Sequence, residues 1–295
     1  MKQDAASRRE AKRISTELDE LLEKEEVRWR QRSRVSWLRA GDRNTAYFHR
    51  KATWRQKKNR IERLQTSSGE ITADSPVMEN LATYFFSELY TNDPTVQPEL
   101  ITHLFEKTVD ARTNDALCAN FSDEETSYAL FQIGPTKAPG PDGFPACFFQ
   151  RNWCTFKEDI VNAVKNFFKD GIMPEGVNDT AIVLIPKIKN PITLKDFRPI
   201  SLCNVIYKIV SKCLVNRLRP LLDDIISPTQ SAFIPGWMIT DNAILAFECI
   251  HALQEGPSNA GSFCAYKPDL MKAYDRVSWT YLEEALRKMG FSDKW

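Results

Sequence analysis

The sequence predicts an α+β protein that is mostly helical, and three observations lead to this fold class. Apolar side chains recur at helical spacing in several long segments, whereas "TAIVLIP" (residues 180–186) is a short continuous apolar run typical of a buried strand. A small hairpin is expected where Ser67, Ser68 and Gly69 separate two short runs with strand propensity. With 42% hydrophobic and 27% charged residues over 295 positions, the composition is that of an ordinary globular protein.

The first half of the chain contains two clear helix signals and one constrained loop. Residues 7–29 are predicted to form a helix, because apolar side chains make one narrow stripe along them (Ile14, Leu18, Leu21, Leu22 and Trp29). Another helix is expected to begin after Ser122, because Ser122 and Glu125 have the spacing of a capping box. "KAPGPDGF" (residues 137–144) follows it, and two Pro with two Gly in eight residues require a tight, stiff loop.

The second half is predicted to hold further helices and one more strand. Residues 196–218 are interpreted as a turn that leads into a helix, and residues 241–253 as another helix. "SFCAYKPDL" (residues 262–270) is a strand candidate. The last helix is expected to have Asp275 as its N-cap and Gly290 just beyond its end.

Charge is distributed unevenly along the chain. Its net charge is +1, yet residues 27–64 contain thirteen Lys and Arg and two acidic residues, a local net charge of +11. Aromatic residues are interleaved with these cations. Cations can neutralise phosphates while aromatic rings stack on bases, so the pattern is typical of contact with single-stranded nucleic acid. The alternative is a solvated basic helix whose aromatic residues pack on the core. The nucleic-acid candidates are Arg28, Arg30, Arg32, Arg34, Trp37, Arg39, Arg43, Arg50, Lys51, Trp54, Arg55, Lys57, Lys58 and Arg60.

Several classes of protein are not expected. No apolar run approaches the roughly 18 residues of a membrane span, and the first residues lack the apolar region of a secretory signal. Seven cysteines are scattered without a C-x-x-C pair, and the three histidines lie far apart in sequence, so a zinc site is not expected. We therefore expect an intracellular protein, in the nucleus or the cytoplasm.

Taken singly, the candidate catalytic residues leave two interpretations open. Six positions separate Asp269 from Asp275, about 20 Å along a continuous strand, which is too far for both carboxylates to hold one metal ion. Asp269 alone is either structural or a metal ligand. Lys187 and Arg198 each lie beside a proline at a predicted element boundary, where an ordinary surface cation is the default.

Five segments, taken together in order and spacing, resemble one family. They are "APGPDGF" (138–144), "IPK" (185–187), "DFRPISL" (196–202), "SPTQSAFIPG" (227–236) and "DLMKAYDRVSW" (269–279). This series resembles the reverse transcriptase of plant LINE-type (non-LTR) retrotransposons. "WLRAGDRNTAYFHRKA" (37–52) resembles the segment that joins the endonuclease of that family to its polymerase. We therefore expect a basic helical N-terminal segment over residues 1–72 and a partial reverse transcriptase domain over residues 73–295.

The resemblance implies a right-hand polymerase fold, with mostly helical fingers and a partial palm. Asp269 matches the catalytic aspartate that holds Mg²⁺, with the backbone carbonyl of Leu270 as a further ligand. Lys187 and Arg198 match the cations that bind the triphosphate of the incoming dNTP, and Tyr274 matches the side chain that packs under its sugar. The implied partners are an RNA template, a DNA primer and a dNTP, with the 138–144 and 230–236 loops around the template and nucleotide.

One motif of the family does not occur among these 295 residues. The remaining metal ligands of the family, a pair of aspartates in an [FY]-A-D-D sequence, should follow Asp269, and no such pair is present. We therefore expect the chain to be a fragment that does not extend a primer by itself, although it derives from an RNA-directed DNA polymerase. The alternative is a non-enzymatic nucleic-acid-binding protein derived from a retrotransposon.

Overall fold

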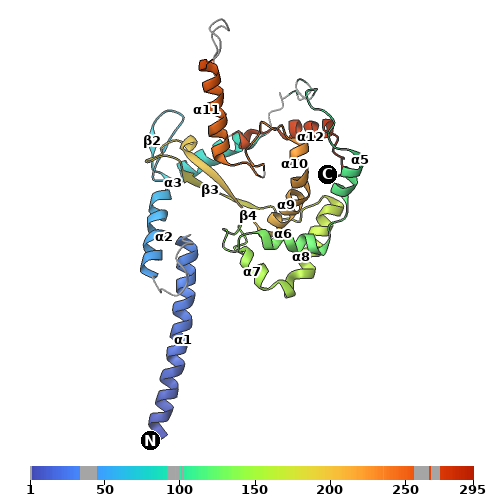
Figure 1. Cartoon of the computed structure of the whole chain (residues 1–295). Helices are drawn as coiled ribbons and strands as arrows, with labels where there is room; N and C mark the ends of the chain where they lie inside the picture. Colours follow the sequence, from blue (N-terminus) through green and yellow to red (C-terminus); the bar gives the residue numbers. More distant parts are fainter. Residues whose placement is uncertain are drawn as a thin grey trace. The chain divides into compact units, whose positions relative to one another are not determined.

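The structure is a computed structural model, shown in Figure 1, and its description covers most of the chain. The described residues are 2–33, 45–91, 97, 100, 103–234, 236–255, 266 and 273–295. Packing divides the chain into two compact units: unit 1 comprises residues 1–83 and 180–202, and unit 2 comprises residues 84–179 and 203–295.

Unit 1 combines long helices with two small sheets. Its elements are α1 (Lys2–Ser33), α2 (Thr45–Asn59), β1 (Leu64–Gln65), β2 (Ile71–Thr72), the first part of α3 (Ser75–Tyr90), β3 (Thr180–Pro186), η1 (Leu194–Asp196) and most of β4 (Phe197–Cys203). β1 pairs with β2 in antiparallel register, Leu64 opposite Thr72, and β3 pairs with β4. The predicted hairpin is confirmed, and its turn requires Gly69 because the backbone there has φ +89°.

A few large side chains anchor unit 1. Phe48 of α2, Leu64 of β1 and Phe197 of β4 are all buried. α2 packs against both α1 and β3. The backbone N–H of Gln65 donates to the carbonyl of Ile192 at 2.7 Å, which ties the β1–β2 hairpin to the connection between β3 and β4.

The regular elements of unit 2 are helices, apart from Cys203 at the end of β4. After the end of α3 it contains α5 (Ala111–Cys118), α6 (Asp123–Gln132), α7 (Ala146–Arg151), α8 (Trp153–Asp170), α9 (Val205–Leu218), η2 (Arg219–Leu221), α10 (Leu222–Ile225), α11 (Ile239–Glu255), η3 (Tyr274–Arg276) and α12 (Trp279–Lys288). The predicted capping box begins α6: the Ser122 side chain accepts from the Glu125 N–H, and the Glu125 carboxylate accepts from the Ser122 N–H.

Two hydrophobic clusters hold unit 2 together. α6, α8 and α9 pack against one another (Figure 1) and enclose the larger cluster, whose fully buried members include Leu130, Val164 and Ile209. The smaller cluster joins α5 to the C-terminal segment through Val109, Leu117 and Phe291. The two clusters together make unit 2 a conventionally packed domain.

One buried guanidinium connects the helices of unit 2. Arg217 of α9 is 11% exposed and forms a bidentate pair with Glu125, at 2.8 and 2.9 Å. It also donates to the backbone carbonyls that end α5 and follow it, those of Leu117, Ala119 and Asn120. Its guanidinium carbon lies 3.4 Å from the centre of the Phe121 ring. Arg217 therefore satisfies polar groups at the end of α5 and at the start of α6 at the same time.

Two predictions about strands need correction. β3 forms where "TAIVLIP" predicted it, but it is not buried: Ile182 and Val183 are 41% and 40% exposed. Among the described strands β3 pairs only with β4, and a two-stranded sheet covers neither face by itself. Residues 197–203, which lie in the segment predicted as a turn leading into a helix, form strand β4. Pro199 lies within this strand, and an edge strand tolerates a residue without an N–H.

The predicted N-cap of the last helix was also wrong. Asp275 lies in the 3-10 turn η3, and α12 begins four residues later at Trp279. Ser278 is the N-cap, because its hydroxyl accepts from the N–H of Tyr281 at 3.3 Å. Val277 is extended (φ −65°, ψ 125°), so the chain cannot continue helically from Asp275. Gly290 follows the helix with φ +94°, as predicted.

The α+β fold class is confirmed as a mixture of helices and small sheets. The division of the chain into a linker over residues 1–72 and a polymerase domain over residues 73–295 stays a prediction. The strand candidate at residues 262–270 lies outside the described residues, apart from the exposed Tyr266. No helix in the described part of the chain is long and apolar enough to cross a membrane.

Candidate nucleotide-binding and nucleic-acid-binding residues

The two predicted nucleotide-binding cations lie on one sheet. The backbone N–H of Lys187, directly after β3, donates to the carbonyl of Asp196 at 2.8 Å, which sets these two residues opposite each other. Arg198 lies two residues beyond Asp196, at the second position of β4. Both cations are exposed. The structure therefore brings Lys187 and Arg198 together at the same end of the β3–β4 pair.

Asp196 fixes the local geometry of this pair of strands. Its carboxylate accepts hydrogen bonds from the N–H groups of Thr193 and Ile192, at 3.0 and 3.3 Å. These bonds, the Thr193 one first, hold the pKa of Asp196 below its usual range, and the nearby Lys187 lowers that pKa further. The Lys187 ammonium itself donates to the carbonyl of Lys195 at 3.1 Å. An incoming phosphate would have to replace that single exposed contact.

The proline- and glycine-rich loop at residues 137–144 is held by α9. Asn204, 5% exposed, lies at the start of α9 and accepts from the N–H of Asp142 through its side-chain oxygen. Its amide nitrogen donates to the carbonyls of Gly176 and Val177. Lys208, one turn later, donates to the carbonyl of Ala138 at 2.9 Å. A side chain at Gly140 would overlap with Asn204, so only glycine fits there.

The basic residues of α1 and α2 lie over aromatic rings. The guanidinium carbon of Arg32 is 5.4 Å from the ring centre of Trp29, and the ammonium of Lys58 is 5.1 Å from that of Trp54. Lys51 lies 5.8 Å from the ring of Tyr47. Trp54 is 59% exposed, and its cationic neighbour is exposed as well. These pairs place positive charges beside flat apolar surfaces, an arrangement that suits a base next to its phosphate.

Arg55 is the most informative residue of α2. Its Nη1 atom is buried and has no hydrogen-bond partner in the part of the chain that the structure describes. A buried donor without an acceptor is costly, and a guanidinium satisfies that need best with a phosphate or carboxylate. The remaining candidates of these helices are surface residues that are exposed or, for Arg30, half-buried (Arg28, Arg30, Arg50, Lys57 and Arg60).

Several predicted site residues fall outside the described residues. These are Asp269, Leu270, Arg34, Trp37, Arg39 and Arg43. Tyr274 is described: it begins η3 in unit 2 and is 89% exposed. Among the described residues, no three His, Cys, Asp or Glu side chains lie together so that they could hold a metal ion. The described residues therefore do not form the Mg²⁺ site that the resemblance implies.

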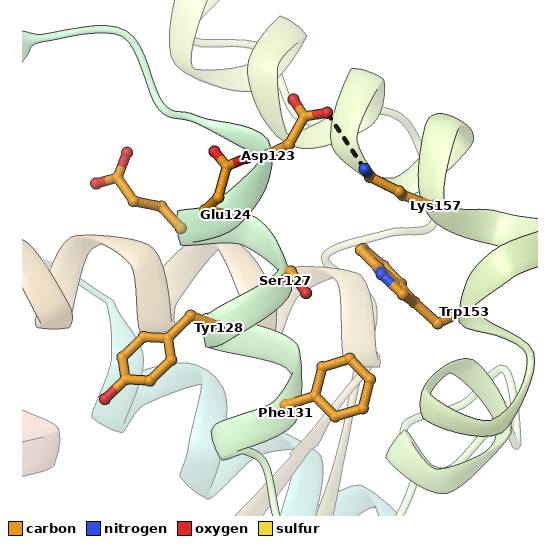
Figure 2. A pocket seen from close by; sticks show the side chains of 8 residues that line it. Asp123, Glu124, Ser127, Tyr128, Phe131, Trp153 and Lys157 are labelled. Carbon is orange, nitrogen blue, oxygen red and sulfur yellow. Dashed lines mark ion pairs between the residues drawn. The ribbon is translucent and has the colours of Figure 1, made fainter.

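A pocket of about 690 Å³ lies in unit 2 between α6 and α8 (Figure 2). Phe131 and Trp153 form its apolar corner, with ring centres 6.2 Å apart and planes at 85°. Asp123 lies at its edge and bonds to Lys165 at 2.6 Å, with Lys157 at 3.8 Å. The bond from Lys165 is the main cause that lowers the pKa of Asp123. No predicted site residue lines this pocket, and its carboxylates make it a poor phosphate site.

Sequence reasoning missed the residues that position the candidate loop. Nothing local in "LCNVIYK" marks Asn204 or Lys208, because both act on segments 27 to 70 residues away in the chain. The rigidity of the loop itself was readable from its Pro and Gly content. The sequence predicts Arg55 as a nucleic-acid-binding candidate, but only the structure shows that its Nη1 atom is buried without a described hydrogen-bond partner.

The C-terminal part of the chain is similar to known reverse transcriptases. Residues 185–295, which include Lys187, Arg198 and Tyr274, match the family described as reverse transcriptase (RNA-dependent DNA polymerase). A wider similarity extends over 262 residues to the Transposon TX1 uncharacterized 149 kDa protein of Xenopus laevis, at 30% identity. The resemblance to a transposon reverse transcriptase that the motifs indicated is thereby confirmed.

The similarity to the Xenopus protein covers a large fraction of this chain but a small fraction of that protein. It includes 88% of this chain but 20% of the Xenopus protein. The chain therefore spans about a fifth of the length of the curated relative that it matches. That relative comes from a frog, so the match does not show that the chain derives from a plant element.

Proposed function

We propose that this chain is part of the RNA-directed DNA polymerase of a plant LINE-type (non-LTR) retrotransposon. The observation that carries the proposal is the match of residues 185–295 to reverse transcriptases, because this span contains four of the five motifs in order. The similarity to a transposon protein over 88% of the chain supports the same origin for the residues before it.

In this proposal the chain supplies the fingers and the start of the palm of a right-hand polymerase. Lys187 and Arg198, at the same end of the β3–β4 pair, bind the triphosphate of a dNTP, and Tyr274 packs under its sugar. Asp269 and the carbonyl of Leu270 are ligands for Mg²⁺, which supplies the charge stabilisation for phosphoryl transfer when bound. The protein acts inside the cell, in the nucleus or cytoplasm, on an RNA template and a DNA primer.

The basic helices α1 and α2 hold the RNA in this proposal. Cations that lie over exposed aromatic rings support stacking on bases together with neutralisation of phosphates. The unpaired Nη1 of Arg55 supports one specific phosphate contact. Because these contacts go to backbone phosphates and base faces, binding should tolerate many RNA sequences.

Fluorescence anisotropy with a labelled single-stranded RNA tests the binding surface. Replacing Lys57, Lys58 and Arg60 by Ala removes three cations from the end of α2 and should lower the slope of log K against log salt by about 2. The control replaces Lys157, Lys165 and Lys169 of α8 by Ala and changes the net charge equally. Equal effects of the two triple variants would mean that binding follows net charge, and α2 would then not be the RNA site.

Arg55→Met separates a binding role from a structural one. The substitution keeps the apolar stem but removes the unpaired donor, so thermal stability should stay equal or rise, since a buried unsatisfied group costs about 1–3 kcal/mol. RNA affinity should fall by about tenfold, because a charge-assisted phosphate contact is lost. A loss of stability with unchanged RNA affinity would assign Arg55 to packing alone.

Primer extension tests whether these 295 residues are sufficient for polymerase activity. The 295-residue polypeptide contains no [FY]-A-D-D pair, so we expect no incorporation of dNTP with Mg²⁺ or Mn²⁺. The matched variant is Asp269→Ala. Incorporation by the unmodified chain that disappears in this variant would contradict the expectation and show that the remaining carboxylates come from residues not recognised above.

A further inference from the structure

The middle of α1 exposes an apolar stripe that nothing in the proposed function uses. Ile14, Leu18 and Leu21 are 54%, 54% and 56% exposed, and Leu22 beside them is 42% exposed. Within unit 1, α2 contacts the C-terminal end of α1, where the rings of Trp29 and His49 lie 4.0 Å apart. Figure 1 shows the N-terminal half of α1 running clear of α2.

The stripe has the spacing of a coiled-coil seam. Ala11, Ile14, Leu18 and Leu21 are separated by three, four and three residues, which are the a and d positions of two consecutive heptads. A helix of 32 residues gains little stability from its own backbone in water, so an exposed seam of this kind favours a second helix against it.

Charge is arranged in blocks along the same helix. Residues 8–13 contain four basic and one acidic residue, a net charge of +3. Residues 17–26 contain six acidic residues and one basic residue, a net charge of −5. The acidic block surrounds the C-terminal half of the seam and would repel RNA. The basic block of a second α1 complements that acidic block in charge and lies on the same stretch of apolar seam.

We propose that α1 is a homodimerisation helix that pairs antiparallel with α1 of a second copy. An arrangement centred between Ile14 and Leu18 sets the basic block of each copy against the acidic block of the other. It also sets Ala11 opposite Leu21 at both ends of the seam, so that a small side chain faces a large one, and Ile14 opposite Leu18 in the middle. A parallel pair in register would instead set basic against basic and acidic against acidic.

Sedimentation velocity of the full 295-residue chain tests the proposal. We expect a reversible equilibrium between the 33.9 kDa monomer and its dimer, with a dissociation constant on the order of micromolar, because the seam is only two heptads long. Leu18→Glu sets two carboxylates into the seam and should raise that constant by at least about 100-fold. Val27→Glu is the matched control: Val27 is 57% exposed on the same helix but off the seam, so the constant should change by less than about threefold.

A charge-reversal variant determines the orientation. Arg9→Glu with Lys12→Glu makes the basic block acidic, which should weaken an antiparallel dimer and strengthen a parallel one, because the parallel pair loses its repulsion between basic blocks. Circular dichroism of each variant checks that the helix content is retained. A chain that stays monomeric at about 100 µM, or a dimer that Leu18→Glu and Val27→Glu weaken equally, overturns the proposal. A dimer that the charge reversal does not weaken overturns its antiparallel form.

Discussion

Units 1 and 2 differ in how their large side chains are packed. Unit 2 buries two hydrophobic clusters, and its helices α6, α8 and α9 share one of them, although its helix α11 exposes Phe247 and Ile250. In the described part of unit 1, the large buried side chains are Phe48, Leu64 and Phe197, whereas the stripe of α1 and the cations of α2 are exposed. Unit 2 therefore has the larger packed core, and unit 1 has the exposed cations that lie beside aromatic rings.

The arginines show the same contrast at the level of single residues. Arg217 in unit 2 is buried with five hydrogen bonds to carboxylate and carbonyl oxygens. Arg55 in unit 1 keeps a buried nitrogen without a described partner. A guanidinium whose donors are all used within the fold has a structural role, whereas the Arg55 nitrogen without a described partner is available to a phosphate in the proposal above.

Arg217→Ala should destabilise the protein most, by about 3–5 kcal/mol. The substitution leaves Glu125 without its partner and three backbone carbonyls without a donor. The measurement is urea unfolding followed by circular dichroism. Arg287→Ala is the matched control, because Arg287 pairs with three carboxylates but is 51% exposed, and we expect less than about 1 kcal/mol. Similar losses for the two variants would contradict a structural role specific to Arg217.

Asn204→Ala should cost less, about 2 kcal/mol, and should loosen the 137–144 loop. The variant removes an acceptor for the N–H of Asp142 and a donor for two carbonyls. Limited proteolysis should cut the loop faster in this variant and in Gly140→Ala, whose new side chain overlaps with Asn204. Gly143→Ala meets no neighbour and is strained only by φ +76°, so it should cost about 1 kcal/mol and serves as the control. Equal cleavage in all variants would mean that Asn204 does not hold the loop.

The smallest effect should appear in the pH dependence of stability. The hydrogen bonds from Arg217 lower the pKa of Glu125 from its ordinary value of 4.5. A lowered pKa in the folded state means that the Glu125–Arg217 pair stabilises the protein above pH 4.5 and loses this contribution as the pH falls through the folded value. The stability difference between wild type and Arg217→Ala should therefore be constant between about pH 5 and 7 and shrink below that range. A difference that grows on acidification would contradict the assignment.

Local signals in the sequence predicted many of the elements. The capping box at Ser122, the turn at Gly69 and the end of the last helix at Gly290 depend on neighbouring residues, and all three are confirmed. Strand β4 and the burial of β3 were predicted wrongly because both depend on which partner strand or layer covers them. The hydrophobic periodicity and the composition of a segment do not show which strand or layer will pack against it.

The candidate site was predictable in its residue types but not in its geometry. The family motifs indicated Lys187 and Arg198, and the structure added that one backbone hydrogen bond sets them at the same end of β3–β4. The support of the 137–144 loop by Asn204 and Lys208 links residues 62 and 70 positions apart in the chain, a distance that local sequence patterns cannot span. Buried polar contacts of this kind emerge only from the tertiary fold.

Ultraviolet cross-linking to RNA, with the cross-linked peptides identified by mass spectrometry, tests the division between the two units most directly. Aromatic side chains stacked on bases are the expected points of attachment. If α2 holds the RNA, cross-links should form in α2, above all at Trp54, which lies beside Lys58, and at Tyr47, which lies beside Lys51. Arg55→Met should reduce their yield. Cross-links concentrated instead in α6 and α8, around Phe131 and Trp153, would contradict this assignment and make the packed unit the RNA-binding one.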